Sequence, residues 1–238
     1  MKLSKSSVNS FLKCRREFQY QFLDKIPSEP NEYMQIGTDV HAIAELFIKN
    51  YDIEGDFYEQ LLDIATSYGS EYPLNTHLYN LSKFFDEIFH DDNVTYKVFS
   101  AEEYIHDTVH NFSGLADLIL EDEDGDLIIV DYKTGKAKPI KNYLLELTYY
   151  KMLVEFKYPD KHVASAGIFF TKDGSMRFTN FVEEQSKGSF VTQEDYDTAI
   201  ELLDFIRNEV TENNIYPERQ FLCKYCTYAD KCEKDGGF

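Results

Sequence analysis

Two aliphatic segments separated by an acidic turn constrain the fold of this chain more than any other feature. Residues 118–120 and 127–130 are entirely aliphatic, and the turn between them consists of Asp, Glu and one Gly. A strand with one solvated face alternates apolar and polar residues, whereas these segments are apolar on both faces. We therefore expect a β-hairpin that is buried on both sides.

The remaining chain divides into helical and strand-like segments according to the period of its apolar residues. Helices are predicted over 7–22, from Gly37-Thr38 onward, near 56–67 and 76–90, and over 142–157 and 193–210. Strands are predicted over 95–105, 111–121, 126–133, 163–171 and 175–182, the last two joined at Asp173-Gly174. This order predicts a mixed α/β core with an N-terminal helical insertion.

Two helices give specific expectations. Ser7 is the predicted N-cap of the first helix, whose Phe11, Leu12 and Phe18 are available for burial. In the second helix an apolar face recurs at helical spacing and should be buried. The residues of that face are Val40, Ile43, Ala44, Phe47 and Ile48.

The polar residues of the buried hairpin are the strongest candidates for chemistry. Asp131 and Lys133 lie two residues apart on one strand and therefore share a face. Asp117 joins them only in one register. A two-residue turn pairs Asp117 with Tyr132, whereas a three-residue loop with a left-handed Gly125 pairs Asp117 with Asp131. A shared metal requires the second register, so we predict an odd-length loop.

Carboxylates in such an apolar hairpin are costly unless they meet a cation. Two carboxylates in an oxygen-rich neighbourhood suit Mg²⁺ or Mn²⁺. Lys133 could orient or deprotonate a bound water, or stabilise charge on a phosphate. An ordinary Asp–Lys pair at a strand end is the alternative that the spacing alone leaves open.

The charge balance bounds the partners of the chain. It carries 24 Lys and Arg against 43 Asp and Glu, a net charge of −19. Such a chain does not coat DNA non-specifically, although a local basic patch acts within a Debye length of about 10 Å. Two stretches are locally basic, residues 1–16 and 133–141.

No apolar run approaches a membrane span and no secretory signal opens the chain, so we expect a cytoplasmic protein.

Cysteine placement indicates metal ligation before disulfides in an intracellular chain. Cys14 lies near the N-terminus, and Cys223, Cys226 and Cys232 follow a C-x2-C-x5-C spacing. Four thiolates hold either tetrahedral zinc or a 4Fe–4S cluster, and spacing alone does not separate the two. Joining Cys14 to Cys232 would tie both ends of the chain together.

Gly114-x-x-Asp117 followed by Asp131-Tyr132-Lys133-Thr134-Gly135 resembles the core motif of the PD-(D/E)XK nuclease superfamily, and in particular its RecB-type branch. The resemblance implies a restriction-endonuclease-like mixed sheet flanked by helices. It implies Asp117, Asp131 and the Tyr132 main-chain carbonyl as metal ligands, with Lys133 as the catalytic lysine.

Gly37-Thr38-Asp39-Val40-His41 resembles the upstream helix of the same branch, which implies His41 as an additional metal ligand. Glu45 lies one turn further on the same helix face and could bind metal directly or through water. A satisfied histidine on an amphipathic helix is the alternative for His41.

The branch also carries a Gln-x3-Tyr motif on the helix after the lysine strand. Tyr150 matches it, whereas Glu146 replaces the amide by a carboxylate. This departure puts negative charge where a phosphate is expected. A solvent-facing Glu146 on an ordinary helix is equally compatible with the sequence.

The four cysteines resemble the iron–sulfur frame of the AddB nuclease domain and of CRISPR-associated RecB-like exonucleases. The resemblance favours a 4Fe–4S cluster on Cys14, Cys223, Cys226 and Cys232, with zinc as the alternative. It implies one RecB-like nuclease domain over residues 1–238. Its expected parts are a helical part at 37–92, a nuclease core at 93–185 and the cysteine frame at 14 and 223–232.

Together these features predict a Mg²⁺- or Mn²⁺-dependent DNA exonuclease that acts on single-stranded or free ends. The basic stretch 133–141 would follow the DNA backbone, and Tyr143, Tyr149 or Tyr150 could stack bases, although helical aromatics more often pack in a core. Partner proteins of recombination, phage replication or CRISPR adaptation are expected from the resemblance. The alternatives are a non-catalytic DNA-end-binding or assembly subunit and a zinc-stabilised interaction protein.

Overall fold

The computed structural model describes residues 1–28, 31–90, 96–181 and 190–237. The predicted boundary at 92–93, the predicted core end at 185, and residues 95 and 182 of the predicted strands lie outside these residues. The chain divides into two compact units. The first unit comprises Met1–Pro30, His106–Ser113 and Asp197–Phe238, and the second comprises Asn31–Ile105 and Gly114–Tyr196.

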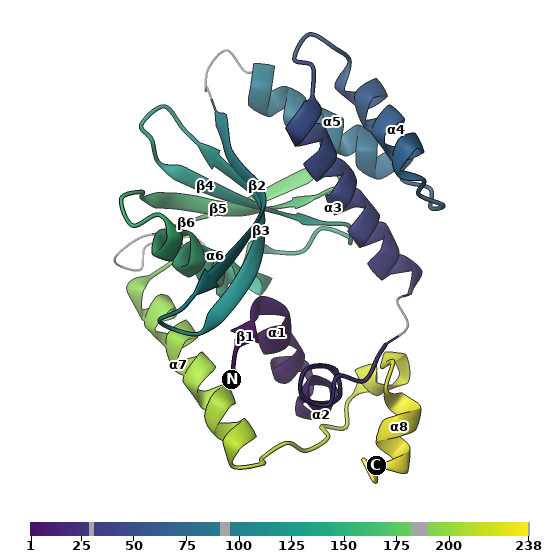
Figure 1. The fold of residues 1–238 in the computed structure, drawn as a ribbon, viewed down its shortest axis with the longest axis vertical. Coiled ribbons are helices and arrows are strands. Elements are labelled where there is room, and N and C mark those ends of the chain that lie inside the picture. Colours follow the sequence, from purple (N-terminus) through teal and green to yellow (C-terminus); the bar gives the residue numbers. More distant parts are fainter. Residues whose placement is uncertain (29–30, 91–95, 182–189, 238) are drawn as a thin grey trace. The chain divides into compact units, whose positions relative to one another are not determined.

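A mixed β-sheet is the centre of the second unit (Figure 1). Its strands are β2 (Lys97–Asp107), β3 (Phe112–Glu121), β4 (Leu127–Lys133), β5 (Val163–Phe170), β6 (Ser175–Phe181) and β7 (Phe190–Val191). The order of the described strands is β1-β3-β4-β5-β6-β7, in which β1 (Leu3–Ser4) runs parallel to β3 at Phe112–Ser113, and β2 also pairs with β3. β4 runs antiparallel to β3 and parallel to β5, with helix α6 (Leu144–Lys157) as the crossover. The predicted mixed α/β fold is confirmed.

The hairpin β3–β4 adopts the register that a shared metal site requires. Leu118 lies opposite Val130 as the last pair of the ladder, which is the register in which Asp117 and Asp131 are the next residues on the two strands. The Asp122 N–H donates to the Asp126 carbonyl at 3.0 Å, which leaves a three-residue loop. Gly125 in this loop has φ +84°, a left-handed conformation that glycine adopts without steric cost. The predicted odd-length loop is confirmed.

Three helices form the helical part of the second unit, α3 (Glu32–Asn50), α4 (Phe57–Tyr68) and α5 (Asn75–His90). The prediction that α3 opens at Gly37-Thr38 is wrong. The helix begins five residues earlier because the Asn31 side chain accepts the Met34 N–H and caps it. The predicted apolar face of α3 is confirmed, since all five of its residues are buried and pack with the hydrophobic side of β3 and β4.

The predicted first helix is divided in the first unit. Strand β1 (Leu3–Ser4) precedes α1 (Lys5–Lys13), α2 (Arg15–Phe18) and a π-helical turn, Gln19–Leu23. Ser7 is not the N-cap. The N-cap is Ser4, whose hydroxyl accepts the Ser7 N–H, while the Ser7 hydroxyl accepts the Ser4 N–H. The helix breaks at Cys14, whose backbone is extended. Leu12 is 49% exposed, contrary to its predicted burial, whereas Phe11 and Phe18 are buried.

The remaining predicted elements are confirmed to within two or three residues. They are α6, the β5–β6 hairpin with Gly174 at φ +64°, and α7 (Gln193–Thr211). The first unit also contains a 3₁₀-helix, Phe221–Tyr225, and α8 (Ala229–Lys234). Strands β1 and β7 have two residues each, too few for a period to reveal them.

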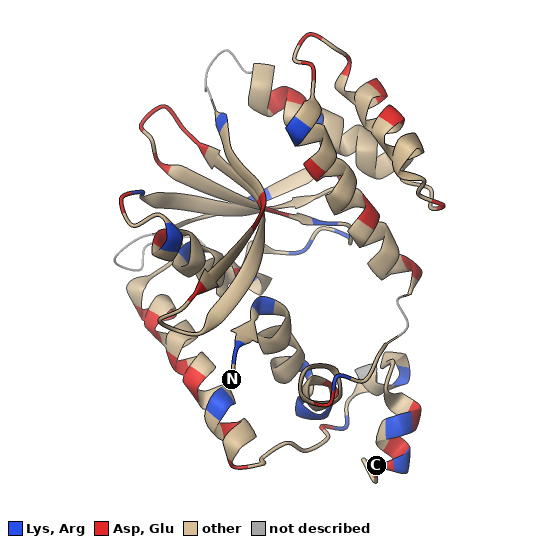
Figure 2. Cartoon of the chain, viewed as in Figure 1, with Lys and Arg blue, Asp and Glu red and all other residues tan. Residues whose placement is uncertain are grey.

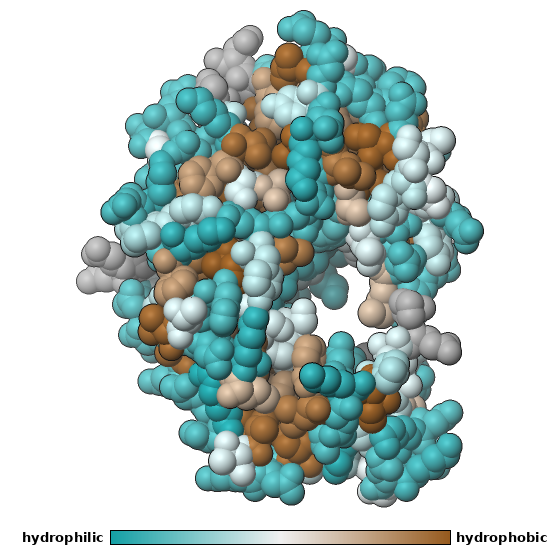
Figure 3. Space-filling view, in the orientation of Figure 1, coloured by the Kyte–Doolittle hydropathy of each residue, from teal (hydrophilic) through white to brown (hydrophobic). Residues whose placement is uncertain are grey.

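The visible surface is mainly hydrophilic, and its hydrophobic side chains form separate patches (Figure 3). Acidic residues recur along α7, whereas acidic and basic residues are mixed on α8 (Figure 2). Within the described residues, no helix is both long and apolar enough to cross a bilayer.

Candidate active site

Three side chains of the second unit converge on one point. His41 comes from α3, Glu102 from β2 and Asp117 from β3, and each offers a ligand atom within 4.8 Å of the other two. Asp117 is buried, while His41 and Glu102 are partly exposed. Among the described residues this is the single group of His, Cys, Asp or Glu side chains with that spacing. One imidazole and two carboxylates form a donor set that Mn²⁺ or Mg²⁺ accepts.

His41 is held by oxygen atoms on both sides of its ring. Its Nδ1 lies 3.3 Å from Glu102 Oε1 and 3.4 Å from Asp117 Oδ1, and its Nε2 lies 3.2 Å from the Tyr132 carbonyl oxygen. Burial lowers the pKa of His41. The charge of Asp117 and the hydrogen bonds to Asp117 and Glu102 outweigh this effect and raise the pKa to about 10. Both ring nitrogens face oxygen atoms, and the nitrogen that binds a metal ion must carry no proton.

Glu102 belongs to this group but was missed by the sequence analysis. It lies in no motif, and its neighbour Glu103 is an equally acidic residue that instead contacts Lys157 and Tyr158. Glu102 has φ +47°, a left-handed backbone that is uncommon for a non-glycine residue in a strand. This local distortion directs one glutamate to His41, and the sequence carries no signal of it. Burial raises the pKa of Glu102, against the lowering effect of His41.

The Asp117 side chain accepts a backbone hydrogen bond between β3 and β4. The pairing of β3 with β4 is regular from Glu121 to Leu118, and one step further the Tyr132 N–H donates to Asp117 Oδ2 at 2.7 Å. A side-chain carboxylate here satisfies a backbone donor that a ladder carbonyl would otherwise satisfy. The strands therefore separate beside Asp117, and the Tyr132 carbonyl remains turned toward His41.

Asp131 and Lys133 are in contact on the same face of β4, as their spacing predicts. Asp131 is 1% exposed; its Oδ1 accepts the Tyr150 hydroxyl at 2.8 Å and its Oδ2 contacts the Lys133 ammonium. Burial lowers the pKa of Lys133, but the carboxylates of Asp131, Glu146 and Asp117 raise it more, to well above its usual value. Lys133 is therefore an ammonium in this arrangement.

Glu146 is not a solvent-facing residue. It is 9% exposed on α6, and its Oε1 accepts from Lys133 Nζ at 2.7 Å. Glu146, which stands where the resemblance implies an amide, is therefore an ionic partner of Lys133.

The tyrosines of α6 do not offer a stacking surface for bases. Tyr149 and Tyr150 are each 1% exposed, so that part of the prediction is wrong. Burial raises the pKa of Tyr150, and the Asp131 carboxylate raises it further, so the hydroxyl remains a donor. Tyr143 is partly buried and packs edge-on against Phe170.

Glu45 lies one turn beyond His41 on α3 but pairs with Lys49 at 2.5 Å. Its charge still contributes to raising the pKa of Glu102, which places it close to the group. Within the described residues it offers no ligand atom to the three-residue cluster.

A second layer of hydrogen bonds fixes the end of β4. The Thr171 N–H donates to the Lys133 carbonyl at 2.9 Å, and Asn80 donates to the Thr171 carbonyl at 2.8 Å. The Thr171 hydroxyl lies 2.7 Å from His77 Nδ1. Burial, followed by the charge of Lys172, lowers the pKa of His77, so this histidine is neutral.

The four cysteines lie together in the first unit. Cys14, Cys223, Cys226 and Cys232 all line one cavity, and none forms a disulfide. Burial raises the pKa of Cys232, and the other three thiols raise it further. No three of these thiols lie within the mutual 4.8 Å that the ligand atoms of the His41 group reach.

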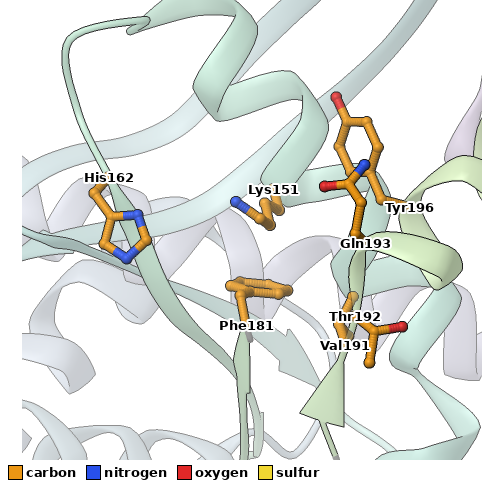
Figure 4. Close-up of a pocket in the computed structure, with 7 residues that line it drawn as sticks. All are labelled: Lys151, His162, Phe181, Val191, Thr192, Gln193 and Tyr196. Atoms are coloured by element: carbon orange, nitrogen blue, oxygen red, sulfur yellow. The ribbon is translucent and has the colours of Figure 1, made fainter. Parts of the chain in front are cut away.

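A separate cavity of about 140 Å³ lies in the second unit beside β6 and β7 (Figure 4). Its lining residues are Lys151, His162, Phe181, Val191, Thr192, Gln193 and Tyr196. None of them was a predicted site residue, so this cavity is distinct from the His41 group.

Comparison with known proteins places this geometry in a family. The model of the PD-(D/E)XK nuclease superfamily matches residues 2–233. The chain belongs to this superfamily. A crystal structure of a "putative exonuclease" from Eubacterium rectale superposes with a TM-score of 0.51 and 13% sequence identity, covering 95% of this chain and 87% of that one. That likeness shows a shared fold. No curated protein matches the chain.

Membership in the superfamily supports a nuclease with DNA as its substrate, and nucleases of this superfamily use divalent metals. Within the described residues, the His41 group is the site with metal-ligand spacing. The residues that the sequence analysis assigned to the core motif, Asp117, Asp131 and Lys133, lie on β3 and β4, and Asp117 is common to both sets.

Proposed function

We propose that this protein is a Mg²⁺- or Mn²⁺-dependent DNA exonuclease of the RecB-type branch. The convergence of His41, Glu102 and Asp117 next to Asp131 and Lys133 is the observation that carries the proposal. A DNA-binding module has no need of such a group, because it places an imidazole and several carboxylates where a phosphate must approach. A divalent cation would make this site attractive to a phosphodiester.

The residues fit a divalent ion by their chemistry. His41, Glu102 and Asp117 would hold it, with Asp131 and the Tyr132 carbonyl as neighbouring oxygen donors, and Glu45 near enough to act through water. The ion would supply Lewis acidity and a nucleophilic water at neutral pH. Asp117 would keep its second oxygen on the Tyr132 N–H, which fixes the orientation of the ligand oxygen.

Lys133 would act on the phosphate. Its ammonium stays charged beside Asp131 and Glu146 and can stabilise the negative charge that builds up during hydrolysis. Tyr150 is a positioning residue in this proposal, because its hydroxyl holds Asp131 and does not reach solvent.

Single-stranded ends are the proposed substrate. The loop after β4 carries Lys136, Lys138 and Lys141, all exposed, while residues 133–141 contain no acidic residue. The Ala137 N–H is bonded to the Asp173 carboxylate, which anchors this loop. A short basic loop on an otherwise acidic protein favours one strand near the site over extensive contact with duplex.

A structural 4Fe–4S cluster is the second part of the proposal, with zinc as its alternative. Cys14, Cys223, Cys226 and Cys232 lining one cavity supports a shared inorganic group, and the resemblance to the AddB frame favours iron. Four thiols fit such a group by chemistry. We also propose that both units serve one nuclease domain, since one family model extends over both.

Cleavage of end-labelled single-stranded DNA in Mn²⁺ tests the catalytic proposal. We expect Asp117→Asn to abolish cleavage and Lys133→Ala to abolish it while sparing DNA binding. Loss of both binding and cleavage with a folded Lys133→Ala, or full cleavage with Asp117→Asn, would contradict it.

Anaerobic purification followed by an absorbance spectrum and iron and sulfide assays tests the cluster. A colourless protein with bound zinc would contradict the iron part alone.

One observation favours a second function, a non-catalytic DNA-end-binding subunit. Glu146 binds Lys133 in place of the amide that the resemblance implies, which reduces the availability of the ammonium for a phosphate. This alternative predicts DNA binding without cleavage by the wild-type protein in either Mg²⁺ or Mn²⁺.

A further inference from the structure

An exposed aromatic pair with a lysine between its rings lies in the first unit. Phe221 is 73% exposed and Tyr225 is 71% exposed, both on the 3₁₀-helix Phe221–Tyr225. Lys224 Nζ lies 3.8 Å from the centre of the Phe221 ring and 4.8 Å from that of Tyr225. The two ring centres are 6.3 Å apart. We call these three residues the aromatic cluster.

The cysteines of the same turn hold the aromatic cluster outward. Cys223 and Cys226 line the thiol cavity, while the aromatic cluster takes no part in lining it. The turn therefore has an anchored side and a solvent side. Two large rings on the solvent side gain nothing from burial, and such exposed apolar groups commonly mark a binding surface.

The charge of the chain reverses where the aromatic cluster begins. Residues 193–218 contain eight acidic residues and one Arg, whereas residues 219–229 contain Arg219 and Lys224 and no acidic residue. Figure 2 shows the acidic residues that recur along α7, and it shows acidic and basic residues mixed on α8, beyond this stretch. On a chain of net charge −19, this local reversal is complementary to a polyanion.

We propose that the aromatic cluster binds single-stranded DNA, with bases stacked on Phe221 and Tyr225 and Lys224 next to a phosphate. Exposed rings recognise any base through its flat face, and a cation near them attracts the backbone. A paired duplex hides those base faces, so the rings select unpaired nucleotides. The inference rests on the proposed function because it names how that enzyme holds its substrate outside the catalytic group.

Alanine variants measure the contribution of each ring. Binding of labelled oligo-dT is followed in EDTA, so that cleavage does not interfere. We expect Phe221→Ala and Tyr225→Ala each to weaken binding by about 5- to 150-fold. Lys224→Ala should also reduce the salt dependence of binding by about 0.7 in log K against log salt, the value for one phosphate. In Mn²⁺, KM should rise while kcat stays unchanged.

The helical part offers a matched control. Tyr79 on α5 is 50% exposed and Lys83 Nζ lies 5.7 Å from its ring centre, which repeats the pairing of a lysine with an exposed ring. Asp86 lines the same surface hollow. Tyr79→Ala and Lys83→Ala should leave oligo-dT binding unchanged.

A tryptophan probe tests stacking directly. The chain contains no Trp, so Phe221→Trp introduces its only indole. Oligo-dT should quench this fluorescence, whereas an abasic oligonucleotide of the same length should not, because it has phosphates but no bases. Tyr79→Trp should respond to neither.

The outcomes separate this inference from the proposed function. Unchanged oligo-dT binding by the doubly substituted Phe221→Ala, Tyr225→Ala protein, or equal quenching by abasic and normal strands, would overturn it even if the wild type cleaves DNA. In that case the cluster is open to a protein partner. A wild type that binds through these rings but fails to cleave would overturn the proposed function and leave this inference standing.

Discussion

Replacing Lys133 by methionine removes the ammonium that contacts two buried carboxylates. Asp131 is 1% exposed and Glu146 is 9% exposed, and an oxygen of each touches the same Nζ atom. Methionine fills a similar volume without charge. The variant therefore tests the ionic arrangement with little change in packing.

The magnitude follows from the geometry. Removing one partner of a buried ion pair costs about 3–5 kcal/mol of unfolding free energy. Two oxygens that touch one nitrogen lie within about 5 Å of each other, and at an effective dielectric of 20 their repulsion is about 3 kcal/mol. Adding Glu146→Gln to Lys133→Met removes this repulsion. The double variant should recover about 2–3 kcal/mol, although Glu146→Gln alone does not stabilise the wild type.

Urea unfolding at pH 7 in EDTA, followed by circular dichroism, measures these free energies. With a slope of about 3 kcal/mol per molar urea, the Lys133→Met midpoint should fall by about 1–1.7 M. Both variants should lack Mn²⁺-dependent cleavage, which separates the stability effect from the chemical one. A Lys133→Met midpoint equal to that of the wild type, or no recovery in the double variant, would refute the reasoning.

Three further predictions concern metal binding, pH and the loop. Glu102→Gln should weaken Mn²⁺ binding by about 10- to 100-fold in titration calorimetry, because a charged donor next to His41 is lost, and equal affinity would exclude Glu102 from the site. The pKa of His77 is lowered in the folded state, so the unfolded chain binds the extra proton and the free energy of unfolding falls as pH drops below about 6.5. Between pH 7 and pH 5, His77→Gln should therefore lose less stability than the wild type in urea titrations. Equal losses in the two proteins would contradict this. Gly125→Ala should cost about 1–2 kcal/mol because φ is +84°, and an unchanged urea midpoint would argue against that conformation.

Much of the site was predictable because its residues are close in sequence. Asp131 and Lys133 share a strand face by simple alternation, and a shared metal site required the odd-length loop at Gly125 that the structure contains. The helical face of α3 that positions His41 follows from the apolar period. Local geometry sufficed in each case, and the structure agrees with it.

Other features depend on contacts that no local rule describes. Glu102 reaches His41 through a left-handed residue in a strand, and Glu146 turns inward to Lys133 because α6 packs against β4 and β5. The stacking role considered for Tyr149 and Tyr150 failed for the same reason, since helix packing buries them. A helical period shows that a face is apolar but not which neighbour covers it.

The sequence by itself determined most of the succession of helices and strands, the buried hairpin, and the spacing of Asp117, Asp131 and Lys133, whereas it left two registers of the hairpin open. These depend on the period and spacing of the side chains, which are local. Tertiary structure alone decided that Glu102 completes the group at His41 and that Glu146 holds Lys133. Each of those contacts joins separate elements, and the free energy that forms it comes from packing of the whole unit.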